Sequence, residues 1–186
     1  MPRVAPLQPP YDETTGPLLA AMMPPGQDPI ALFRTFAINP AMTAAMGGWG
    51  GYELSRSLSL SLRAREIVID RTCARCRCEY EWGVHVAHFG ERAGLDRRQI
   101  ASLTHGGADD PCWTDPAERA LIRVVDHLHD RSDLDDAHWT ELIGHYSDAQ
   151  ILDLLLLTGW YHAISYTANA VRLDPEPGTP RFADYT

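Results

Sequence analysis

The sequence lacks the long apolar segments that membrane and secreted proteins carry. Its densest apolar stretch, residues 151–164, is interrupted by Asp153, and no run of about 18 apolar residues occurs, so a transmembrane helix is not expected. Residues 1–17 contain no apolar core of a signal peptide. Cysteine is also scarce, and three of the four cysteines lie close together, unlike a disulfide framework spread across a secreted fold. We therefore expect a cytoplasmic protein.

Positive charge is scarce as well. The chain has 16 lysines and arginines against 25 aspartates and glutamates, which gives a formal net charge of -9. Such a balance argues against binding to nucleic acid and to anionic membrane surfaces. The apolar content of 45% and the length of 186 residues are sufficient for one domain with a proper core.

Signals for β-strands are nearly absent, whereas signals for helix starts recur. No Asn-Gly or Asp-Gly turn joins alternating segments. An aspartate or asparagine followed by proline occurs at residues 28–29, 39–40 and 115–116, and each pair predicts a helix start. Glu118 adds a predicted capping box to the third pair, and Asp96 is expected to cap another short helix. The sequence therefore predicts an all-α fold.

Proline-rich segments at both ends suggest the domain organisation. We expect an N-terminal arm with a short helix over residues 1–27, one compact multi-helix domain over residues 28–173, and a tail over residues 174–186. Four glycines at residues 47–51 either admit a neighbouring helix at close range or interrupt their own helix, and the sequence leaves this choice open.

One central segment contains most of the reactive side chains. Cys78, Glu81, His85 and His88 recur at offsets of three and four residues, so one helix over residues 77–94 would place them on one face. A cysteine in the first turn of a helix is favoured as a thiolate. A nearby imidazole can transfer a proton to or from the sulfur. This pattern favours a catalytic site.

Two other interpretations of these residues remain open. Cysteines commonly pack as small apolar residues, and a Glu–His pair four residues apart is commonly a solvated surface pair. Cys78, Glu81, His85 and His88 are also permissible zinc ligands. Four ligands along more than two turns of one straight helix cannot surround one ion, however, so no metal is expected from this segment.

The central segment, "REIVIDRTCARCRCEYEWGVHV" (residues 65–86), resembles the carboxymuconolactone decarboxylase and alkylhydroperoxidase D-like superfamily. The likeness extends to "FRTFAINPAM" (33–42), "AGLDRRQIASL" (93–103) and the long segment over residues 147–171. The resemblance implies an all-α fold of antiparallel helix hairpins, assembly as a homo-oligomer, either a trimer or a hexamer, and no bound cofactor.

The resemblance also assigns roles to individual residues. The peroxidase branch has an upstream glutamate, a Cys-x-x-Cys pair and a histidine four residues later, and Glu66, Cys78 and His85 match this pattern. Glu81 occupies the position of the second cysteine, so the usual disulfide of the family cannot form. The decarboxylase branch has a Glu-x-x-x-His step, which Glu81 and His85 match.

The expected activity is thiol-dependent reduction of a hydroperoxide, of the peroxiredoxin type. Cys78 would be the reacting thiol, Glu66 and His85 would transfer the proton, and Glu81 would tune the thiol. The alternatives are a non-redox lyase, decarboxylase or isomerase that acts on a small carboxylate or lactone through His85 and Glu81, and a non-catalytic helical oligomer.

Further residues complete the expected site. Cys73 and Cys76 have the spacing of a redox pair, so either could form a disulfide with an oxidised Cys78 if the helix breaks near residues 75–77. Otherwise an external thiol would reduce the oxidised Cys78. The residues expected to line the pocket are Tyr80, Trp82, His88, Tyr161 and His162.

Overall fold

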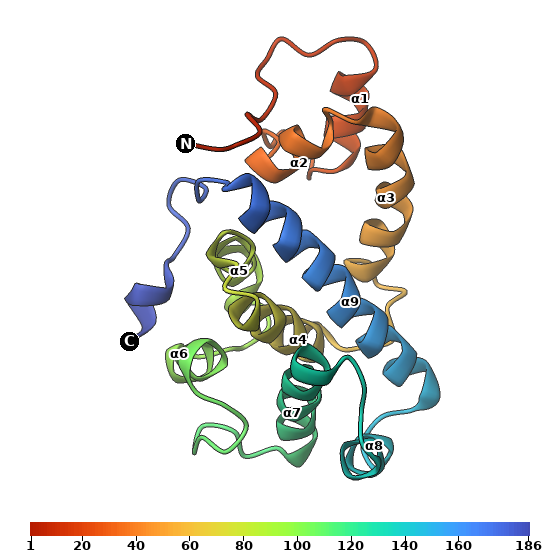
Figure 1. Cartoon of the computed structure of the whole chain (residues 1–186), viewed down its shortest axis with the longest axis vertical. Coiled ribbons are helices and arrows are strands. Elements are labelled where there is room, and N and C mark those ends of the chain that lie inside the picture. Colours follow the sequence, from red (N-terminus) through yellow and green to blue (C-terminus); the bar gives the residue numbers. More distant parts are fainter.

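The protein is entirely helical in its computed structural model, which describes residues 1–186 (Figure 1). The elements are α1 (Thr15–Ala21), α2 (Ala31–Phe36), α3 (Pro40–Glu53), α4 (Leu62–Arg75), α5 (Glu79–His85), the π-helical turn η1 (Val86–Gly90), α6 (Arg97–His105), α7 (Pro116–Arg131), α8 (Asp136–Ile143), α9 (Asp148–Val171) and the 3-10 turn η2 (Phe182–Tyr185). The all-α prediction is confirmed. None of the helices is both long and apolar enough to cross a membrane.

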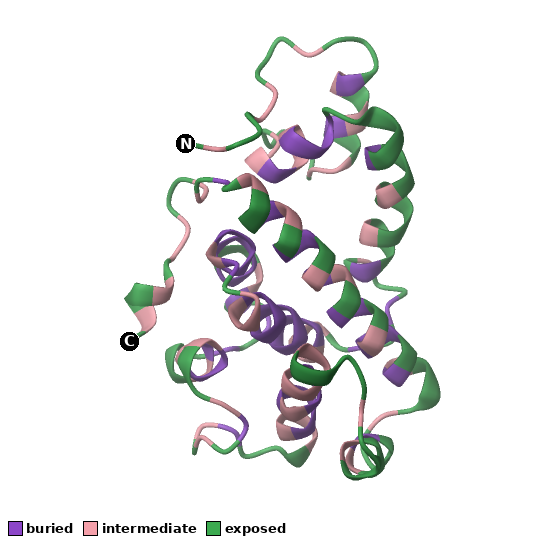
Figure 2. Cartoon of the chain, in the orientation of Figure 1, coloured by how far each residue is buried: buried purple, intermediate pink, exposed green.

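Helix α4 lies at the centre of the fold. It packs against α5, α6, α7 and α9, and every residue from Arg65 to Cys73 is buried. Figure 2 shows this burial around α4, whereas the long helix α9 alternates buried and exposed positions. Because α4 is covered on all sides, its charged side chains must find partners inside the protein.

Two predicted helix starts are confirmed and a third is confirmed in part. The Asn39 side chain accepts a hydrogen bond from the Met42 backbone at the start of α3, and Asp96 forms a capping box at the start of α6. Asp115 caps α7 as predicted, but the capping box with Glu118 is wrong. The Glu118 carboxylate instead forms an ion pair with an arginine of α4.

The helix start predicted after Asp28 is wrong. Helix α2 begins at Ala31 and has no capping side chain of its own. Its first backbone N–H groups are satisfied by distant residues instead: Glu176 of the tail accepts from Ala31, and the Tyr80 hydroxyl accepts from Leu32 at 2.9 Å. Tertiary contacts therefore replace a local cap at this helix.

The glycine-rich stretch at residues 47–51 continues as helix, within α3. A side chain at Gly50 would place its Cβ 2.9 Å from the Trp160 ring of α9, while Trp49 packs against the same ring at 4.9 Å between centroids. The open question is thus answered in favour of close helix packing, at Gly50.

The C-terminal tail packs back onto α5 (Figure 1). The rings of Phe182 and Tyr185 meet the buried Trp82 ring edge-on, with centroids 4.9 and 5.5 Å away. Arg181 forms an ion pair with Glu79, the first residue of α5, at 2.7 Å. These contacts hold the short helix α5 in position against α4.

Candidate active site

The chain breaks between α4 and α5, where the cysteines lie. Helix α4 ends at Arg75, and Arg77 has a left-handed backbone with φ of 53°. Cys78 then forms the N-cap of α5, and its backbone N–H donates to the Cys73 carbonyl at 2.8 Å. The break near residues 75–77, which a disulfide between Cys78 and Cys73 or Cys76 would require, is thus present.

The prediction of one helix over residues 77–94 is wrong. Helix α5 ends at His85, and the π-helical turn over residues 86–90 inserts an extra residue that rotates the chain about its axis. His88 consequently points to solvent, and Cys78 to His88 do not form one continuous face. The zinc arrangement considered from this spacing does not form either.

His85 lies at the centre of a buried polar cluster. Its Nδ1–H donates to the Glu66 carboxylate of α4 at 2.8 Å, and both side chains are almost completely buried. Its Nε2 lies 3.0 Å from the Tyr161 hydroxyl of α9. Three helices therefore meet at one imidazole.

Two further side chains complete the surroundings of His85. The Oε1 atom of Glu81 lies 3.6 Å from His85 Nε2, and the Oε2 atom of Glu81 is buried without a hydrogen-bond partner. Arg65 donates from Nε to the other oxygen of Glu66 at 2.7 Å. The Arg65 guanidinium lies over the Phe89 ring, 5.0 Å from the centroid. Glu66 is thus held on both oxygens, whereas Glu81 keeps one free acceptor.

Burial and charge act in opposite directions on His85. Burial lowers its pKa, but the carboxylates of Glu66 and Glu81 outweigh burial and raise the pKa to about 10. His85 is consequently an imidazolium at neutral pH and a potential proton donor. One turn after Glu66, Asp70 is fully buried with neither oxygen hydrogen-bonded, and burial followed by the charge of Glu66 raises its pKa well above the usual range. Asp70 is therefore a neutral acid in this cluster.

Three cysteine side chains gather around Ser165 of α9. The Ser165 hydroxyl donates to Cys73 Sγ at 4.0 Å, and the sulfurs of Cys76 and Cys78 lie near the same hydroxyl. Cys73 and Cys78 are fully buried, and Cys76 is half-buried. Any oxidised sulfur here would have a second thiol nearby.

The Cys78 thiol is not activated in the resting structure. Burial raises its pKa to about 12. The thiolate expected at the start of the helix is therefore disfavoured, because α5 is too enclosed for its N-terminus to offset the loss of hydration. Glu81 lies between Cys78 and His85 in the first turn of α5, and its carboxylate lies 3.6 Å from His85 Nε2.

The structure brings only one of the residues expected to line the pocket to His85. Tyr161 contacts the imidazole. Tyr80 hydrogen-bonds the tail and α2, Trp82 packs under the tail, and His88 is exposed. His162 lies in a separate cleft beside α7.

Sequence reasoning missed Arg65, Asp70 and Ser165. Arg65 and Asp70 belong to a helix expected to be only partly apolar, so their burial was not expected. Charged residues lie directly before and after the apolar run Ile67–Ile69, and this pattern could have indicated that the helix is buried together with its charged side chains. Ser165 carried no such signal, because its role comes from the crossing of α9 over α4.

Comparison with known proteins finds one matching family and several solved structures with a similar fold. The family described as "Carboxymuconolactone decarboxylase family" matches residues 40–127. No curated protein matches the chain. Among solved structures, a peroxidase-related protein from Silicibacter sp. TM1040 is 18% identical, with 96% of each chain covered and a TM-score of 0.81.

Two other solved structures are similar in fold. The debrominase Bmp8 in complex with 2,3,4-tribromopyrrole is 17% identical, with 94% of this chain and 91% of that chain covered and a TM-score of 0.77. The Agrobacterium tumefaciens protein ATU0492, described as an AhpD-type antioxidant defence protein, is 21% identical, with 76% and 94% covered and a TM-score of 0.68. The TM-scores show that these proteins share the fold of this chain, and at such low sequence identity the likeness extends to the fold alone.

Proposed function

Because this chain belongs to the carboxymuconolactone decarboxylase and alkylhydroperoxidase D-like superfamily, we propose that it is a thiol-dependent reductase in which Cys78 reduces a small hydroperoxide. The observation that carries the proposal is the position of Glu81, which follows the N-cap residue Cys78 by one helical turn and places a carboxylate oxygen 3.6 Å from His85 Nε2. Peroxide reduction needs a nucleophilic sulfur and a proton donor for the leaving oxygen, and these residues supply both.

The first step begins with the protonated Cys78 thiol. Its proton passes to the free carboxylate oxygen of Glu81 as the sulfur attacks the terminal peroxide oxygen. A sulfur–oxygen bond forms and the oxygen–oxygen bond breaks, so the sulfur is oxidised to a sulfenic acid and the peroxide is reduced. The leaving alkoxide takes a proton from the His85 imidazolium, and Glu81 then returns its proton to His85.

Cys73 completes the cycle as the resolving thiol. Its sulfur attacks the sulfur of the Cys78 sulfenic acid, which forms a disulfide and releases water. Cys73 is favoured over Cys76 because the Cys76 sulfur also lies against the His129 ring, on the side away from this centre. An external dithiol then restores both thiols by exchange, so the proposal includes such a reductant as a partner.

Peroxide consumption with a dithiol reductant tests this proposal. Cys78→Ser should abolish turnover and also the trapping of a sulfenic acid. Cys112→Ser is the matched control, because Cys112 lies in a surface cleft between α6 and the tail and should retain turnover. Wild-type turnover in Cys78→Ser would overturn the proposal. The substrate panel should include 2,3,4-tribromopyrrole, because the structurally similar Bmp8 binds it.

A second function is favoured by the high pKa of Cys78 and by Glu81 in the position of a second cysteine. His85 would then transfer a proton to or from a small carboxylate or lactone, as a lyase, decarboxylase or isomerase, with Glu66 and Tyr161 orienting the ring. Cys78→Ser separates the two functions. His85→Gln would abolish this activity, whereas Cys78→Ser would leave it intact.

The proposal also includes assembly as a homo-oligomer. Large apolar side chains are exposed along α3 and α9, including Trp49, Tyr52, Leu152 and Leu156. Covering them with a second copy of the chain would remove apolar surface from water. Light scattering after gel filtration should give a trimer or hexamer, and a monomer at micromolar concentration would contradict this part of the proposal.

A further inference from the structure

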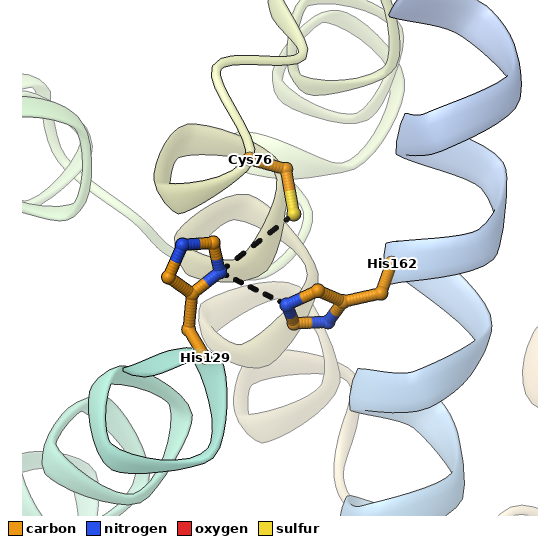
Figure 3. Close-up of side chains that lie close together, drawn as sticks. All are labelled: Cys76, His129 and His162. Carbon is orange, nitrogen blue, oxygen red and sulfur yellow. Dashed lines mark hydrogen bonds between the residues drawn. The ribbon is translucent and has the colours of Figure 1, made fainter. Parts of the chain in front are cut away.

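A second cluster of reactive side chains lies outside the His85 centre. Cys76 at the end of α4, His129 near the end of α7 and His162 in the middle of α9 point their ligating atoms at one another (Figure 3). The His129 Nδ1 atom lies 2.9 Å from His162 Nε2 and 3.9 Å from Cys76 Sγ. All three ligating atoms lie within 4.8 Å of one another.

The hydrogen bonding of His162 fixes its tautomer. Its Nδ1 atom lies 2.8 Å from the Thr158 carbonyl oxygen, one turn earlier in α9. A carbonyl only accepts hydrogen bonds, so Nδ1 must carry the proton. In the neutral ring the Nε2 atom then presents a lone pair to the cluster. Metal-binding histidines are oriented by this kind of backbone hydrogen bond from the other ring nitrogen.

The surroundings of His129 favour its neutral form. Burial lowers the pKa of His129, and the neighbouring His162 and Arg75 lower it further. A neutral imidazole is the form that binds a metal. The neutral His129 ring can therefore serve as a ligand, and with His162 and the Cys76 thiol it forms a set of two nitrogens and one sulfur.

The cluster is accessible from solvent. His129 and His162 line a surface cleft of about 270 Å³, together with Ser132 and Tyr166. The three cluster residues are each half-buried, so an ion could enter and their side chains could adjust. The cleft has room for a water molecule as a further ligand.

We propose that Cys76, His129 and His162 bind a zinc ion, with a water molecule from the cleft as the fourth ligand. One thiolate and two imidazoles form a donor set that zinc prefers. Tetrahedral zinc places two nitrogens about 3.4 Å apart and a sulfur and a nitrogen about 3.6 Å apart. The distances of 2.9 and 3.9 Å therefore need shifts of only a few tenths of an ångström.

Zinc binding here would join three helices that are far apart in the sequence. It would also hold the Cys76 sulfur as a metal-bound thiolate, which removes its proton and protects it from alkylation and oxidation. The inference does not depend on the proposed peroxide reduction, since neither histidine contacts the His85 centre.

The competing explanation is a plain hydrogen bond between the two histidines, with His129 donating. A second cluster, His127, Asp135 and His138, also has possible ligands close together. Asp135 already caps α8 and pairs with His138 at 2.7 Å, which explains that cluster without a metal. His127 therefore offers a matched control on the same helix as His129.

The test uses the full-length protein, stripped of metal with a chelator under reducing conditions and titrated with zinc and then with cobalt. We expect one equivalent of zinc per chain. The cobalt form should show a thiolate charge-transfer band and the strong visible bands of a tetrahedral site. Cys76→Ser and His162→Gln should each weaken zinc binding on the order of 100-fold, and His127→Gln should bind like wild type.

Additional measurements keep the result independent of folding and of catalysis. Far-ultraviolet circular dichroism of the metal-free variants checks that they fold, and mass spectrometry measures whether zinc slows alkylation of Cys76. Zinc binding that is unchanged in His162→Gln would overturn the inference. So would a cobalt spectrum without the thiolate band, or loss of binding in His127→Gln.

Discussion

Two histidine sites flank the break between α4 and α5, and they differ in charge and burial. His85 is enclosed by the carboxylates of Glu66 and Glu81, which raise its pKa to about 10. His129 is half-buried beside Arg75 and another histidine, and its pKa is lowered. The same side chain is thus prepared as a proton donor in one site and as a neutral metal ligand in the other.

The sulfurs differ in the same way. Cys78 is fully enclosed and its pKa is raised to about 12, so the proposed reaction gives its proton to Glu81. Cys76 is half-buried, and a cation between it and two imidazoles would remove its proton directly. Two cysteines two residues apart therefore lie in different surroundings, because the chain turns sharply at Arg77 between them, and we propose different chemistry for each.

Removing the Glu66 carboxylate, which distinguishes the buried His85 site, should have the largest effect on turnover and on stability. Glu66→Gln should lower the pKa of His85 and slow turnover by about 10²–10⁴-fold, because the general acid loses its charge. Loss of one partner of a buried ion pair should also reduce the free energy of unfolding by about 3–5 kcal/mol. Steady-state kinetics, denaturant unfolding and an NMR titration of the imidazole measure these effects.

The buried pair also makes stability depend on pH. The pKa of His85 is about 10 in the folded protein, above its unfolded value of about 6.5. The stabilisation is therefore fully present below about pH 6.5 and is lost as the pH rises toward 10. Urea unfolding from pH 6 to 10 should show this decline in the wild type and not in Glu66→Gln. Equal slopes in the two proteins would contradict the assignment.

Zinc binding at Cys76, His129 and His162 should stabilise the folded protein by less than the Glu66→Gln change destabilises it. At a free zinc concentration 100 times the Kd, the folded protein should gain about 2.7 kcal/mol, which raises Tm by about 5–10 °C for a chain of this size. Differential scanning calorimetry measures the shift. His162→Gln should abolish it and Glu66→Gln should retain it, whereas equal shifts in both variants would place the metal elsewhere.

Removing the Tyr161 hydroxyl, which contacts His85, should have a smaller effect on turnover. Tyr161→Phe removes one hydrogen bond, worth about 1 kcal/mol, and should slow turnover about fivefold. The pH profile should keep its shape, because Glu66 and Glu81 still hold the charge of the imidazole. A loss as large as that of Glu66→Gln would instead make Tyr161 the proton donor.

The smallest effect is expected at Asp70, which serves as a control for Glu66. Asp70 is a neutral acid, so Asp70→Asn keeps its charge and its shape and should change stability at neutral pH by less than about 1 kcal/mol. Thermal unfolding at pH 7 measures the change. Destabilisation comparable with that of Glu66→Gln would show that Asp70 is ionised.

Local patterns were read correctly where one short segment contains all the interactions. The caps at Asn39 and Asp96 bond to backbone groups within three residues. The cap predicted at Asp28 failed because a tail residue 145 positions from Ala31 satisfies that helix start instead. The helix over residues 77–94 failed because a π-helical turn leaves no signal in residue spacing.

The sequence by itself determined that this protein is all-α, where α3, α6 and α7 begin, and that Cys78, Glu81 and His85 occupy adjacent turns. Only the tertiary structure decided which of these side chains are charged and what they contact. The Glu66–His85 pair joins residues 19 apart, and the His129–His162 pair joins residues 33 apart. Such pairs depend on how α5, α7 and α9 pack on α4, and the pKa values follow from burial and neighbouring charges, which exist only after the helices pack.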